Sequence, residues 1–126
     1  MLIILAMKKL FLFLTLTLSV TLFAQTANLH DWMFRMSGAY TCLQYHLPMC
    51  KSDEVTIAVF RDATLQAYQQ IMAMPKYQVP AIREATEKLF RRMQVDFDAY
   101  PKAADDDAKQ AIIKDMTDVM QAGHRL

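Results

Sequence analysis

Apolar side chains recur every three or four residues in four stretches of the chain, which is the period of one helical face. The stretches run from Asn28 to Pro48, Ser52 to Pro75, Pro80 to Pro101, and Asp105 to Gly123. None of them alternates apolar and polar residues as a half-buried strand does. The pattern therefore predicts an all-α fold.

The boundaries of these stretches carry residues that begin and end helices. Asn28 and Ser52 have short polar side chains that accept hydrogen bonds from the first amide groups of a helix. The three acidic residues 105–107 stand where we expect the fourth helix to begin. Pro80 suits the first position of a helix, because its missing N–H group has no partner there. We expect Pro48 and Pro75 to end helices and Pro101 to break or restart one.

Each predicted helix has one apolar face. The first is formed by Leu29, Trp32, Met33, Met36, Tyr40 and Leu43. The second is formed by Val55, Val59, Phe60, Ala63, Ala67, Ile71 and Met74. The third is formed by Ile82, Ala85, Leu89, Met93 and Phe97, and the fourth by Ala108, Ile112, Met116, Val119 and Gly123. The connections are short, which makes neighbouring helices antiparallel. Residues 25–126 are thus predicted to form an antiparallel up-down-up-down four-helix bundle.

The first 24 residues have the pattern of a secretory signal peptide. Lys8 and Lys9 precede an apolar run from Leu10 to Ala24, and a small residue ends that run. We predict a signal peptide over residues 1–24, with Met7 as the start and cleavage before Gln25. The alternative is a membrane anchor, for which about 20 apolar residues are needed. No cysteine follows Ala24 to carry a lipid, so we expect no stable membrane anchor after cleavage.

Charge argues against nucleic acid as a partner. The chain has 14 Lys and Arg against 13 Asp and Glu, and without Lys8 and Lys9 the balance is 12 against 13. A nucleic-acid-binding domain shows a basic patch or stripe, and none is evident in this sequence.

Cys42 and Cys50 flank the first predicted turn. Secretion brings a chain into an oxidising compartment, where we expect the two thiols to form a disulfide. Two free thiols are the alternative, and the spacing is not that of a zinc-binding pair.

Enzyme chemistry has little support in the sequence. The three histidines, His30, His46 and His124, form no evident triad with Ser and Asp, and the acidic residues fit helix caps and solvated faces. In an antiparallel bundle, however, Met33 and His124 lie at the same end. A thioether and an imidazole facing each other are an axial ligand pair for haem iron. The alternative is a core methionine and a histidine that interacts with the helix dipole.

A family resemblance favours the haem interpretation. The segment from Ala27 to Met36 reads ANLHDWMFRM and resembles the opening of mature cytochrome b-562, a periplasmic haem protein. Arg83 to Phe97 resembles the third helix of that family. Ala108 to His124 resembles its last helix, which ends with a ligand histidine.

The resemblance implies a periplasmic electron carrier with non-covalent haem b, exchanging electrons with other periplasmic redox proteins. Met33 and His124 would be the axial iron ligands. The other residues implied to contact haem are Met36, Ile82, Met120 and Arg125.

This sequence also departs from the family pattern. Ile82 and Thr86 stand where family members usually have aromatic residues. Met120 replaces an arginine that reaches a haem propionate, a role we expect Arg125 to take. The stretch from Met120 to His124 lacks the two cysteines through which related c-type cytochromes attach haem.

Two haem-free functions remain as alternatives. His30, Met33 and Met36 recur every three residues and offer soft ligands for reduced copper. A disulfide-linked bundle also suits a periplasmic adaptor or inhibitor that binds a protein partner.

Overall fold

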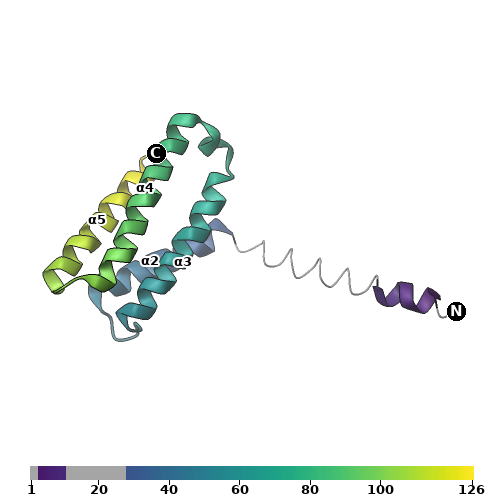
Figure 1. Ribbon diagram of the computed structural model, residues 1–126, viewed down its shortest axis with the longest axis horizontal. Coiled ribbons are helices and arrows are strands. Elements are labelled where there is room, and N and C mark those ends of the chain that lie inside the picture. Colours follow the sequence, from purple (N-terminus) through teal and green to yellow (C-terminus); the bar gives the residue numbers. More distant parts are fainter. Residues whose placement is uncertain (1–2, 11–27) are drawn as a thin grey trace.

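A computed structural model describes residues 3–10 and 28–126, and over these residues the fold is all-α, without strands (Figure 1). The four long helices are α2 (Leu29–Tyr45), α3 (Asp53–Met72), α4 (Pro80–Ala99) and α5 (Asp106–His124). Two short 3₁₀ helices, η1 (Pro75–Gln78) and η2 (Tyr100–Lys102), connect α3 to α4 and α4 to α5.

The N-terminal segment is described only in part. Residues 3–10 are helical and exposed, whereas most of the apolar run assigned to the signal peptide, and its cleavage site, lie outside the described residues. No helix among the described residues is long and apolar enough to cross a membrane.

The two predicted N-terminal caps, Asn28 and Ser52, are confirmed, and Asp105 is the cap of α5. The Asn28 side chain accepts a hydrogen bond from the Asp31 amide at 3.0 Å. The Asp105 side chain accepts one from the Ala108 amide at 2.8 Å, and Ser52 caps α3 in the same way. Each cap satisfies an amide that has no partner within its own helix.

The helix ends differ slightly from the proline positions. α2 ends at Tyr45, ahead of Pro48, because His46 adopts a left-handed conformation with φ 48°. α3 ends at Met72, and Pro75 opens η1 instead of ending a continuous helix. Pro80 begins α4, as predicted.

Side-chain contacts join α3 to α4 in reverse order along the two helices. Tyr68 stacks on Phe90 near the η1 end, with ring centroids 3.9 Å apart. Further along α3, Arg61 pairs with Asp98 at 2.7 Å. The two helices therefore run in opposite directions.

Other contacts bring α2 and α5 into the same assembly. The rings of Tyr40 and Phe60 pack edge to face, with their centroids 6.4 Å apart, and this contact joins α2 to α3. The Tyr40 hydroxyl is hydrogen-bonded to the Thr117 hydroxyl of α5 at 2.6 Å. Arg92 of α4 forms an ion pair with Asp115 of α5.

The core includes residues from all four long helices. Its largest fully buried side chains are Leu43, Phe60, Phe97, Tyr100 and Met116. One part of the predicted pattern is wrong: Val55 and Val59 were assigned to the inner face of α3 but are 41% and 46% exposed. Thr56 and Ile57 are buried instead. Thr56 can enter the interior because its hydroxyl donates to the Ser52 carbonyl at 2.9 Å.

The predicted disulfide is confirmed. Cys42 and Cys50 are bonded, with their Cα atoms 5.6 Å apart, inside the usual range for this link. The bond ties the last turn of α2 to the segment that leads into α3.

Candidate functional site

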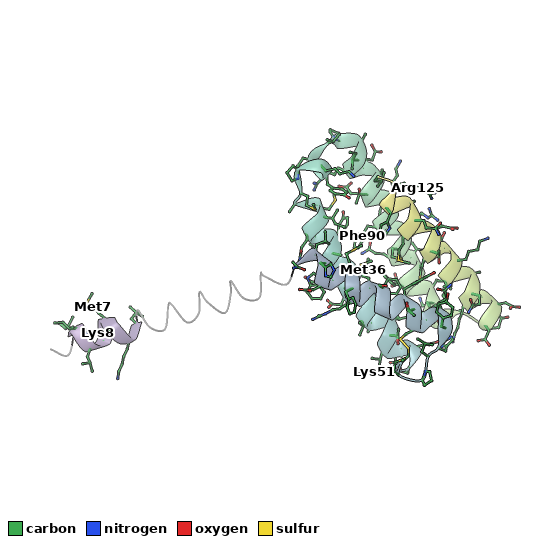
Figure 2. All side chains as sticks on the ribbon, turned by 180° about the vertical axis from the view of Figure 1, so that it is seen from behind. Met7, Lys8, Met36, Lys51, Phe90 and Arg125 are labelled. Atoms are coloured by element: carbon green, nitrogen blue, oxygen red, sulfur yellow. A yellow bond between two sulfur atoms is a disulfide. The ribbon has the colours of Figure 1, made fainter. Side chains whose placement is uncertain are left out.

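A pocket of about 450 Å³ opens between the four long helices and η1. This volume is within the range of roughly 300–1,000 Å³ that is usual for small-molecule sites. Apolar side chains from all four helices dominate the wall: Leu29, Met33, Met36, Ala67, Ile71, Leu89, Phe90, Met93, Val119 and Met120. In Figure 2, Met36 and Phe90 lie between the helices, whereas Arg125 lies at the end of α5.

Met33 and His124 both line this pocket. Met33 is half-buried near the start of α2, and His124 is the last residue of α5. Residues near the two ends of the segment 28–126 therefore line one cavity.

The His124 ring is oriented by the backbone of its own helix. Its Nδ1 atom lies 2.7 Å from the Met120 carbonyl oxygen, which can only accept a hydrogen bond. Nδ1 therefore carries the proton, and the lone pair of the neutral ring is on Nε2. Metal-binding histidines commonly donate the second ring N–H group in this way, which fixes the tautomer and the direction of the ligating nitrogen.

The other predicted contact residues divide into two groups. Met36 and Met120 line the pocket together with Met33 and His124. Ile82 and Arg125 do not: Ile82 is half-buried in the first turn of α4, and Arg125 is exposed beyond α5.

An aromatic pair in the wall was missed by the sequence analysis. Tyr68 and Phe90 line the pocket, and their rings stack with an angle of 3° between planes. Phe90 follows Thr86, another lining residue, by four positions and thus shares its face of α4. That spacing was visible in the sequence, but the partner Tyr68 on α3 was not.

The polar groups of the wall are few. The Thr64 and Thr86 hydroxyls donate to the carbonyls of Phe60 and Ile82, both at 2.7 Å, and so do not need a ligand as partner. No Asp or Glu side chain is among the lining residues that the structure describes.

A carboxyl pair with shifted pKa values lies away from the pocket, between α4 and α5. Burial and, to a lesser extent, the interaction with Asp115 raise the pKa of Asp96 to about 7, while Arg92 opposes the shift. Hydrogen bonding to Asp96 and Arg92 lowers the pKa of Asp115. One oxygen of Asp96 is buried without a hydrogen-bond partner. Since none of these three residues lines the pocket, the pair bears on stability and not on ligand chemistry.

The described residues contain no group of three or more His, Cys, Asp and Glu side chains that could hold a metal ion. Haem iron does not need such a group, because the porphyrin supplies four of its ligands. The residues of the copper alternative are separated: Met33 and Met36 line the pocket, whereas His30 is exposed and does not.

Comparisons with protein-family models, with curated proteins and with solved structures find no match for this chain. The pocket and its residues are therefore what indicates a function.

Proposed function

We propose that this chain is a periplasmic one-electron carrier that binds non-covalent haem b, with Met33 and His124 as axial ligands. The observation that carries the proposal is that these two residues line a single apolar pocket. The hydrogen bond from His124 Nδ1 to the Met120 carbonyl supports it, because it leaves Nε2 as the ligating atom.

The chemistry of the pocket fits the haem group. The two faces of haem are flat and apolar. The pocket wall matches them, because it is formed mainly by hydrocarbon and thioether groups and includes the stacked rings of Tyr68 and Phe90. Met36 and Met120 add flexible side chains that can pack against an irregular surface and exclude water. Bound haem supplies a one-electron iron couple, whose potential is set by the axial ligands and by the polarity around the ring.

Ligation by both residues argues for electron transfer and against catalysis. A thioether from Met33 and an imidazole from His124 would fill both axial positions, so no position would remain for oxygen or a substrate. The protein would act by holding the ligands in place and excluding water, not by making or breaking covalent bonds.

The up-down-up-down bundle is part of the proposal. It is supported by the reverse order of contacts between α3 and α4 and by the short connections η1 and η2. In such a bundle the first and last helices are antiparallel neighbours, which agrees with Tyr40 contacting Thr117 while Met33 shares a pocket with His124.

The proposal is tested by titrating the haem-free chain with haemin and recording visible spectra before and after dithionite. A low-spin spectrum with a sharp α band on reduction is expected. His124→Ala should weaken binding by about 100-fold or more, since even loss of a residue that only orients a metal ligand costs about 10- to 100-fold.

Matched controls separate ligation from general damage. His30→Ala removes an exposed histidine outside the pocket, and Met49→Ala removes a methionine that is 79% exposed. Both should bind haem as the native chain does, whereas Met33→Ala should lose the low-spin band. A native chain that binds no haemin, or a Met33→Ala variant with an unchanged spectrum, would contradict the proposal.

A further inference from the structure

The charge around the pocket is unequal. Among the described residues that line it, Lys76 is the only Lys or Arg, and no Asp or Glu side chain is present to balance its charge. A cation beside an apolar cavity favours a ligand that is mostly apolar and carries an anionic group at one edge.

The backbone of η1 fixes the position of Lys76. The Tyr77 amide donates to the Met74 carbonyl at 3.1 Å. The Gln78 side-chain amide donates to the Met72 carbonyl at 2.8 Å, which ties the turn to the end of α3. The lysine therefore projects from a short, internally hydrogen-bonded segment that forms part of the pocket wall.

Lys76 also has no anionic partner within the part of the chain that the structure describes. Its Nζ lies 5.8 Å from the Tyr77 ring centroid, and it makes no ion pair with the described residues. Arg83, close in sequence, is different: it pairs with Glu87 at 3.5 Å and donates to the Met72 carbonyl. An ammonium group without a partner can take a ligand carboxylate without first breaking an internal ion pair.

We infer that Lys76 is the carboxylate-binding residue of this pocket and selects ligands that carry an acidic group at the edge of a flat apolar body. The inference rests on the proposed function, in which that group is a haem propionate. It reassigns the role that the sequence suggested for Arg125, which does not line the pocket.

The test compares the binding of two ligands by the native chain and by three variants. Haemin carries two carboxylates, and its dimethyl ester carries none. Dissociation constants for both are measured with the native chain and with Lys76→Ala, Arg125→Ala and Lys102→Ala. Lys102 is a matched control, because it is an exposed lysine in η2, at the opposite end of α4 from η1.

The native chain should bind haemin about two- to fivefold more tightly than the ester, which is the range for one partly exposed ion pair. Lys76→Ala should bind the two ligands equally, with its low-spin spectrum intact, and Lys102→Ala should keep the native preference. Added salt should reduce the preference of the native chain but not change that of Lys76→Ala.

Each other outcome points to a different error. If Lys76→Ala keeps the native preference, or if Arg125→Ala alone abolishes it, the assignment of Lys76 is wrong while haem binding stands. If neither porphyrin gives a low-spin spectrum with the native chain, the proposed function fails, and this inference fails with it.

Discussion

The two halves of this protein are packed in opposite ways. Around η2 and the disulfide, Leu43, Phe60, Phe97 and Tyr100 are at most 2% exposed. Around η1, the same four helices leave a pocket of about 450 Å³. The first half thus holds the fold together, and the second half leaves room for a ligand.

Polar contacts deepen the difference. In the packed half, Asp53 accepts a hydrogen bond from the Tyr100 hydroxyl at 3.0 Å and lies 3.5 Å from Lys109. It thereby links α3 with η2 and α5. In the open half, Lys76 is the cation that corresponds to Lys109, and it has no carboxylate partner among the described residues.

Methionines provide the strongest test of this comparison, because both halves contain them. Met116→Ala should lower the free energy of unfolding by about 2–5 kcal/mol, since the side chain is fully buried and a cavity would remain. Met36→Ala should cost about 1 kcal/mol or less in the ligand-free chain, because a side chain beside a pocket has fewer packing partners to lose.

Urea unfolding of both variants, followed by circular dichroism, measures the two costs. Equal costs would show that the open half is as important for stability as the packed half. The native chain with saturating haemin serves as a control, because a bound ligand should raise its unfolding midpoint.

Removing the disulfide should have the next largest effect. Replacing both cysteines with serine should lower the free energy of unfolding by about 2.5 kcal/mol, since the bond closes a short loop in the unfolded chain. The variant should still bind haemin with native affinity, because neither cysteine lines the pocket. A large loss of affinity at temperatures where the variant is folded would show that the two halves are coupled.

The smallest expected effect concerns Asp96. Its folded-state pKa of about 7 is above the ordinary value of 3.8, so the folded chain retains a proton that the unfolded chain releases. The contribution of Asp96 to stability is therefore greatest below about pH 4, falls as the pH rises to about 7, and changes no further above that. Asp115 contributes in the opposite direction, because its pKa is lowered.

Asp96→Asn should remove most of this pH dependence. The variant should be more stable than the native chain by about 1 kcal/mol or more at pH 8, and by less at pH 4. Asp62→Asn is the matched control, because Asp62 is an exposed carboxylate that forms no ion pair with the described residues. Thermal unfolding of the three chains at both pH values would reveal an incorrect assignment if the gain were the same at each.

The sequence by itself determined the local features of this protein. The caps at Asn28, Ser52 and Asp105 and the start of α4 at Pro80 depend on groups only a few residues apart. The disulfide was predictable for a similar reason, since its cysteines flank one short turn. That Met33 and His124 line one pocket was predictable from the order and direction of the helices alone.

Only the tertiary structure decided which faces of the helices meet. In α3 the buried face includes Thr56 instead of Val55 and Val59. Thr56 can be buried because its hydroxyl donates a hydrogen bond to the Ser52 carbonyl. Tyr68 and Phe90 stack across two helices, and Lys76 reaches the pocket from η1, where no helical period indicates its direction. Such contacts depend on the rotation of one helix against another, which is set by packing of residues far apart in the sequence.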